Sequence, residues 1–156
     1  MRLVLITVGE RMPAWVVQGV DDYARRLPRE CALELVELPA ARHGRGAMVD
    51  RAIADEGRRL LDACPKRCRR IVLDERGQLW RTADLAVRLD DWLQGGTDVA
   101  LLIGGADGLS AEVKANAEVS WSLSPLTLPH ALVRVLVAEQ LYRAWTILKR
   151  HPYHRE

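Results

Sequence analysis

Two adjacent glycines, Gly104 and Gly105, follow an apolar run at 99–103, and Ser110 then begins a helical pattern. Glycines between a strand and a helix allow close approach of a ligand or of another part of the backbone. The segment LLIGGADGLS is not a dinucleotide fingerprint, because G-x-G-x-x-G has another spacing, and it is not a phosphate loop, because no Gly-Lys-Ser/Thr follows. A tight turn in which the glycines only supply positive φ remains the alternative to a ligand site.

Two other segments follow apolar runs. Asp74 and Glu75 come directly after a short apolar run, and the segment SLSPLTLPH (122–130) carries two prolines. Because each proline ring fixes φ, such a loop holds its N–H and C=O groups in set directions and can bind a flat heterocycle through its backbone. Ligands of parallel sheets bind at the carboxyl ends of the strands. We therefore expect a small-molecule cleft there, with the glycines making room for the body of the ligand.

The end of the chain offers groups for proton transfer and RNA contact. Tyr153, His154 and Arg155 follow Pro152, which fixes a turn. A histidine can move a proton, an arginine can stabilise an anion and a tyrosine can stack on a base. From these residues alone, a frayed basic terminus is the alternative.

Two positions in the last long helical pattern are ambiguous. Arg143 lies four residues after Glu139, so the two form either a simple helix-stabilising ion pair or a pair that presents a cation to a substrate. His130, at the start of the pattern, is either a partly buried capping residue or a catalytic one.

The three cysteines do not suggest a metal centre. Cys64 and Cys68 are close in sequence but Cys31 is not, and a tetrahedral site would need His43 as well. We expect reduced thiols and no metal.

Apolar runs alternate with helical patterns along the chain, which predicts an α/β domain with a mostly parallel sheet flanked by helices. Without a repeat or linker, residues 1–156 are expected to form a single domain. The expected strands are 3–8, 32–38, 70–74, 98–103 and 119–123, and the expected helices are 13–27, 47–63, 82–94 with Thr82 as its cap, a short one from Ser110, and 130–149.

The composition is that of an ordinary globular protein, with 49% hydrophobic and 28% charged residues. We expect a cytoplasmic protein, because no run approaches the roughly 20 apolar residues of a membrane span and no signal peptide is evident. The net charge of +2 does not itself indicate a nucleic-acid binder. Basic clusters in RRLPRE, ARHGRG, PKRCRR and KRHPYHRE leave an anionic partner open.

The segments LLIGGADGLS, SWSLSPLTLPHALVRVLVAEQLYRAW and HPYHRE, together with the opening MRLVLITVGERMPAW, resemble the RlmH family of SPOUT-class methyltransferases over essentially the whole chain. The resemblance implies a C-terminal trefoil knot, S-adenosylmethionine as cofactor, and a homodimer. It also implies methylation of N3 of a pseudouridine in 23S ribosomal RNA on the assembled 70S ribosome or large subunit. The implied cofactor contacts are Leu73, Gly104, Gly105, Leu123, Ser124, Pro125, Leu126, Thr127 and Leu128.

Methyl transfer from a sulfonium needs aligned reactants, and the ring nitrogen must lose a proton. We therefore expect His154 to handle the proton, with Tyr153, Arg155 and Arg143 contacting the RNA or the ring anion. The broad apolar stripe of helix 130–149 suggests a homodimer in which the tail of one chain reaches the cofactor of the other. A non-catalytic ribosome-binding or assembly factor is the main alternative, and a flavodoxin-like nucleotide-binding module is a weaker one.

Overall fold

The computed structural model describes residues 1–42 and 44–155. Five parallel strands form one sheet in the order β2-β1-β4-β3-β5. The strands are β1 (Arg2–Val8), β2 (Ala32–Leu38), β3 (Arg69–Leu79), β4 (Val99–Ile103) and β5 (Val119–Ser122). The α-helices are α1 (Ala14–Arg26), α2 (Ala47–Asp62), α3 (Thr82–Gly95), α4 (Ala111–Ala115) and α5 (His130–Leu148), and the 3₁₀ helices are η1 (Arg29–Cys31) and η2 (Pro152–Arg155).

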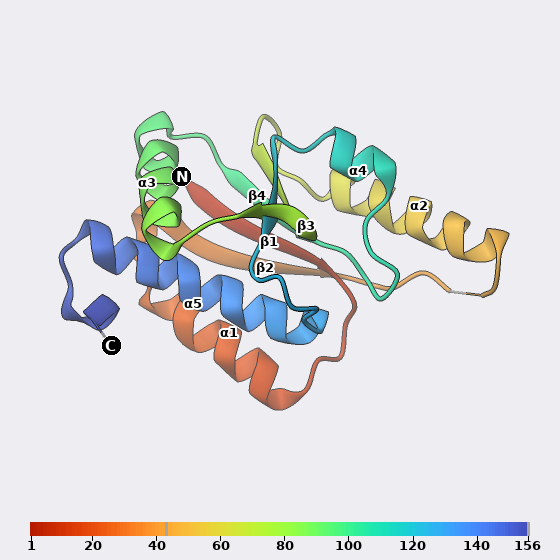
Figure 1. Cartoon of the computed structure of the whole chain (residues 1–156), viewed down its shortest axis with the longest axis horizontal. Helices are drawn as coiled ribbons and strands as arrows, with labels where there is room; N and C mark the ends of the chain where they lie inside the picture. Colours follow the sequence, from red (N-terminus) through yellow and green to blue (C-terminus); the bar gives the residue numbers. More distant parts are fainter. Residues whose placement is uncertain (43, 156) are drawn as a thin grey trace.

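Helices cover both faces of the sheet, as the predicted α/β fold requires (Figure 1). One face packs against α1, α3 and α5, and the other packs against α2 and α4. Alternate residues of a strand point to opposite faces, so Leu3 and Leu5 of β1 enter the first core while Val4 and Ile6 enter the second. This explains why β1 and β4 read as continuous apolar runs. The trefoil knot implied by the family resemblance stays a prediction.

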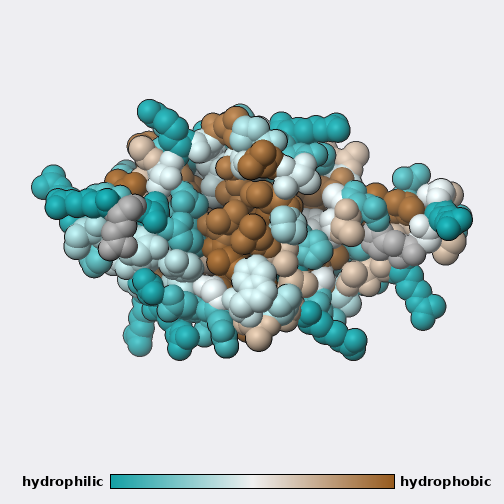
Figure 2. Space-filling view, turned by 60° about the horizontal axis from the view of Figure 1, so that its bottom comes forward, coloured by the Kyte–Doolittle hydropathy of each residue, from teal (hydrophilic) through white to brown (hydrophobic). Residues whose placement is uncertain are grey.

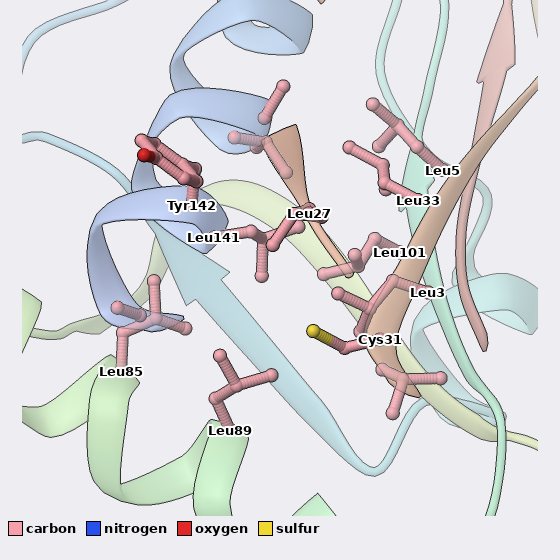
Figure 3. Packing of buried hydrophobic residues seen from close by; sticks show 14 of the residues in the cluster. Leu3, Leu5, Leu27, Cys31, Leu33, Leu85, Leu89, Leu101, Leu141 and Tyr142 are labelled. Atoms are coloured by element: carbon pink, nitrogen blue, oxygen red, sulfur yellow. The ribbon is translucent and has the colours of Figure 1, made fainter. Parts of the chain in front are cut away.

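The first core is built largely of leucines from the sheet, α3 and α5 (Figure 3). Cys31 is fully buried there beside Leu3, and burial raises the pKa of its thiol to about 11. Burial is also the main reason why the pKa of Cys64 rises to about 11. All three cysteines are free thiols, as expected from their odd number.

Strand β3 differs most from its prediction, since it continues to Leu79 instead of ending at Asp74. Both Leu73 and Gln78 align with Trp121 of β5, so residues 74–77 bulge out of the ladder before the pairing resumes. The bulge returns against β5 at Gly77, where a Cβ atom would lie 2.6 Å from the carbonyl carbon and oxygen of Ser120. A strand interrupted by a bulge shows no regular alternation of apolar and polar residues along its whole length, so the sequence does not reveal its full extent.

The predicted helix cap at Thr82 is wrong. The carboxylate of Asp84 accepts the N–H of Arg81 at 2.9 Å, so Arg81 is the cap and Thr82 is the first helical residue. The Thr82 hydroxyl instead donates to Gln140 of α5 at 2.8 Å. By contrast, Ser110 accepts the N–H of Val113 and caps α4 as predicted.

Helix α5 is apolar on almost every side, because it packs against the sheet, α1 and α3 at once. Positions i, i+4, i+7 and i+11 share a helix face, so Leu132, Leu136, Glu139 and Arg143 form one stripe, and all four are only half-buried. The side of the molecule that carries α1 and α5 shows a central apolar patch surrounded by polar groups (Figure 2). On the same side, Trp15 of α1 is 55% exposed.

The close approach of Gly77 to β5 gives a test of the bulge. Gly77→Ala places a Cβ against backbone that cannot move independently, so we expect a loss of about 1–3 kcal/mol in the free energy of unfolding. Gly95→Ala, where the new Cβ meets only the end of the Arg69 side chain at 3.9 Å, should be neutral or slightly stabilising. Equal urea midpoints for the two variants would contradict this account.

Candidate functional site

A cavity of about 470 Å³ lies at the carboxyl edge of the sheet, among the loops after β4 and β5 and the bulge of β3. This volume is in the range of cofactor and small-molecule sites. The residues that line it are Leu73, Asp74, Glu75, Arg76, Ile103, Gly104, Gly105, Ala106, Asp107, Gly108, Leu109, Lys114, Trp121, Leu123, Ser124, Leu126, Thr127, Leu128, His130 and Val133. The three segments singled out from the sequence thus meet at one place.

The lining includes all but one of the predicted cofactor contacts. Pro125 is exposed and is not among the lining residues, whereas its neighbours Ser124 and Leu126 are. The loop around Pro125 is held by its own hydrogen bonds: Ser122 donates to the carbonyl of Ser124 at 3.0 Å, and the Ser124 hydroxyl accepts the N–H of Leu126 at 3.0 Å. Pro125 therefore shapes the loop from outside.

The glycines of the loop pack closely against neighbouring parts of the chain. A Cβ on Gly104 would lie 2.8 Å from the carbonyl oxygen of Gly108, and a Cβ on Gly105 would lie 3.1 Å from Glu56 of α2. Gly105 and Gly108 also form a β-bridge across the turn. These contacts let the loop fold tightly against itself and against α2, and the glycines also line the cavity. That they make room for the body of a ligand stays a prediction.

Charged groups of both signs line the cavity. Lys114 of α4 pairs with Asp74 at 2.9 Å. Burial raises the pKa of Asp74, but hydrogen bonds from the side chain of Lys114 and the N–H of Arg76 outweigh it, so the pKa stays below its usual value. The hydroxyl of Thr127 donates to Glu75 at 3.1 Å and links the two-proline loop to the β3 bulge.

His130 lines the cavity at the start of α5, one turn before Arg134. Arg134 is fully buried and donates to Glu37 at 2.7 Å, to the carbonyl of Gly9 at 2.8 Å and to that of Val8 at 3.3 Å. Burial, followed by the positive charge of Arg134, lowers the pKa of His130. His130 therefore faces the cavity as a neutral imidazole at pH 7.

The four residues predicted to act in catalysis do not line the cavity. They lie in the last turns of α5 and in η2. Arg143 pairs with Glu139 at 2.7 Å, and its guanidinium carbon lies 4.9 Å from the centre of the Tyr153 ring. Tyr153 donates from its hydroxyl to Glu139 at 3.1 Å, and its ring meets that of Tyr142 edge-on at 4.7 Å. Burial and hydrogen bonds raise the pKa of Tyr153, so it stays a phenol. The tail is docked on α5 rather than frayed.

His154 and Arg155 complete this cluster at the far end of α5. His154 is half-buried, and its Nδ1 has no hydrogen-bond partner in the part of the chain that the structure describes, while Arg155 is exposed. From His130 to Leu148 the helix rises about 27 Å. Figure 1 accordingly shows the C-terminus at the opposite end of α5 from the loop before it. Within one chain, the tail cluster and the cavity are separate.

Among the described residues, no group of three histidines, cysteines or acids is placed to hold a metal ion. His43, the fourth ligand that a cysteine site would need, lies outside the described residues. Within residues 1–42 and 44–155, no helix is long and apolar enough to cross a membrane.

The whole chain matches a known protein family. The model described as predicted SPOUT methyltransferase matches residues 1–154. The chain belongs to the SPOUT methyltransferase family. Ribosomal RNA large subunit methyltransferase H of Thioalkalivibrio sulfidiphilus is 55% identical over 156 residues, 100% of both chains. The protein of the same name from Hydrogenovibrio crunogenus is 53% identical over 156 residues, again 100% of both chains.

Solved structures agree with the SPOUT methyltransferase fold. A methylase family protein from Neisseria gonorrhoeae matches with a TM-score of 0.54 and 16% identity, covering 90% of this chain and 81% of that one. At this identity the likeness concerns the fold alone.

Sequence reasoning missed some lining residues of this SPOUT methyltransferase. Neither Lys114 nor Trp121 was singled out from the sequence. Trp121 is 3% exposed and stacks on Trp80 at 5.0 Å, so it serves the core and the cavity wall together. No local pattern in the sequence marks Lys114, because its place at the cavity depends on its ion pair with Asp74 of the β3 bulge.

The tight packing of the glycine loop generates a prediction. Gly104→Val forces the carbonyl of Gly108 to move, which displaces the loop that lines the cavity. Restoring the original loop geometry on binding would cost up to about 3 kcal/mol, so S-adenosylmethionine should bind up to roughly 150-fold more weakly. Calorimetry on the folded variant checks this, with Gly95→Ala as control and Gly104→Ala as a milder variant should Val prevent folding. Wild-type affinity in a folded Gly104 variant would contradict the assignment of this loop.

Proposed function

We propose that this SPOUT methyltransferase transfers a methyl group from S-adenosylmethionine to N3 of a pseudouridine in 23S ribosomal RNA of the large subunit, in the cytoplasm. The observation that carries the proposal is the cavity lined by the three segments of the glycine loop, the β3 bulge and the two-proline loop. It occurs in a chain that is 55% identical along its full length to a ribosomal RNA large subunit methyltransferase H.

The lining of the cavity fits the cofactor. S-adenosylmethionine carries a flat adenine, a carboxylate, and two cationic groups, an ammonium and a sulfonium. Leucines of β3 and of the two-proline loop offer apolar surface for the ring, and the backbone of that loop offers polar groups for its edge. Asp74 and Glu75 suit the cations, and Lys114 suits the carboxylate. A neutral His130 also avoids placing another positive charge beside a sulfonium.

Bound S-adenosylmethionine supplies an already activated methyl group, so the protein has to align the acceptor, exclude water and take up a proton. We assign the proton to His154, because an imidazole nitrogen can accept a proton and the Nδ1 of His154 has no hydrogen-bond partner in the described part of the chain. Arg155 and Arg143 stabilise the ring anion that forms as N3 loses its proton. Tyr153, as a phenol, positions these groups through Glu139 and the ring contact with Arg143.

We propose further that the active site is shared between two chains of a homodimer. The tail cluster lies at one end of α5 and the cavity at the other, about 27 Å away. The stripe Leu132–Leu136–Glu139–Arg143 places apolar surface and the tail cluster on one side of α5. The side of the molecule that carries α1 and α5 shows a central apolar patch (Figure 2). Two copies packed through this side would cover the patch and bring each tail toward the other cavity.

A non-catalytic ribosome-binding factor with the same fold is the second candidate. It requires no cofactor and no ordered proton-handling group. The cavity and the docked tail favour an enzyme instead, because both retain polar groups that binding alone would not need.

The experiment that separates the two candidates uses S-adenosylmethionine with a labelled methyl group. We expect label in the large-subunit RNA when intact ribosomes are the substrate, with less transfer to protein-free RNA, and we expect the labelled nucleoside to be N3-methylated pseudouridine by mass spectrometry. The Gly104→Val chain is the control for cofactor dependence. Ribosome binding without any transfer of label would overturn the enzymatic function.

A further inference from the structure

The loops after β1 and β2 lie at the same end of the sheet as the cavity, although they do not line it (Figure 1). Gly9, in the first loop, has His130 of the cavity as a near neighbour: a Cβ on Gly9 would lie 3.9 Å from Nε2 of His130. In the second loop, the N–H of Ala41 donates to Glu56 at 3.1 Å, and Glu56 lies behind Gly105. Both loops are therefore fixed beside the cavity by buried contacts.

Each of these loops carries exposed arginine. Arg11 follows β1, Arg42 and Arg45 follow β2, and Arg76 stands on the β3 bulge at the cavity itself. We refer to these four as the arginine rim. Within the described residues, none of the four forms an ion pair.

Several exposed arginines on or beside the helices are ion-paired instead. Arg25 pairs with Asp21 at 2.8 Å, Arg59 pairs with Asp55 at 2.7 Å, and Arg81 pairs with Asp84 at 3.0 Å. These pairs are formed within one helical turn, so their charge is largely compensated. The rim thus places four exposed guanidinium groups, without ion-pair partners among the described residues, around one end of the sheet in a chain whose net charge is only +2.

The backbone supports a role for Arg11. Its φ is +59°, a region that L residues rarely adopt and where glycine or asparagine is more usual. Non-glycine residues in this region tend to cluster where function requires a fixed direction of the side chain. Arg11 directly follows Glu10, so this turn carries charged side chains of both signs.

We propose that the arginine rim binds the phosphate backbone of the substrate RNA where it passes across the cavity. This rests on the proposed function, since a nucleotide that reaches the cavity must bring the phosphates before and after it over the surrounding loops. Guanidinium groups bind phosphate through paired hydrogen bonds that lysine cannot match. The loops after β1 and β2 and the bulge of β3 then hold the RNA in place without reading its sequence.

The test uses Arg42 and Arg45, because neither lines the cavity and neither belongs to the tail cluster. The variant Arg42→Gln/Arg45→Gln is compared with Arg25→Gln/Arg58→Gln, which removes the same charge from exposed helix positions that are ion-paired. Binding to intact large ribosomal subunits and to polyuridylate RNA is measured over a range of salt concentrations. S-adenosylmethionine affinity and thermal stability are measured in parallel.

We expect the rim variant to bind both RNAs between about fivefold and 60-fold more weakly at 0.1 M salt, with the slope of log affinity against log salt smaller by about two. For methyl transfer, KM for ribosomes should rise while kcat and cofactor affinity stay unchanged. The control variant should differ little from wild type.

Two results would overturn the proposal. In the first, the rim variant keeps the affinity and salt slope of the wild type or of the control. In the second, binding to large subunits weakens but binding to polyuridylate does not. That result would mean that the rim binds a ribosomal protein and not the RNA backbone. Neither measurement requires methyl transfer, so failure of the proposed function in the wild-type assay is a separate outcome.

Discussion

The guanidinium of Arg134 is a cation enclosed in the protein, and it ties the longest helix to the edge of the sheet where the cavity lies. It donates to the carboxylate of Glu37 at the end of β2 and to two backbone carbonyls at the end of β1. A buried charge is tolerated only when such groups compensate the lost hydration, so α5 has one favourable position relative to these strands. His130, one turn earlier, and the loop that enters α5 are therefore held at the cavity that the glycine loop after β4 also lines.

The same helix separates the two halves of the proposed chemistry. Its first turn lines the cavity, and its last turns carry Arg143 and the docked tail about 27 Å away. Because Arg134 prevents the helix from shifting along the sheet, no small movement within one chain can bring Tyr153 or His154 to the cavity. The geometry thus favours an active site completed by a second chain, with the apolar side of α1 and α5 as the surface between them (Figure 2).

Most of the fold followed from the sequence, because parallel strands buried on both faces give apolar runs and the helices between them are amphipathic. The meeting of three strand ends at one cavity was also predictable, since parallel strands share a carboxyl edge. The β3 bulge was not, because it depends on Gly77 fitting against the backbone of β5. The packing of Gly104 against the carbonyl of Gly108 was not predictable for a similar reason: a glycine needed by a ligand and one needed by a neighbouring carbonyl look alike in sequence. The contact between Tyr153 and Arg143 depends on a tail that turns back on α5, which no local pattern specifies.

The shared active site is tested most directly by mixed dimers. A Gly104→Val chain, with a damaged cavity and an intact tail, is combined with a chain that lacks residues 152–156, and doubly tagged dimers are purified. Each parent homodimer should be inactive, while the mixed dimer should transfer methyl groups at about half the wild-type rate, because one of its two composite sites is intact. Mixed dimers that form, bind S-adenosylmethionine and remain inactive would contradict the account.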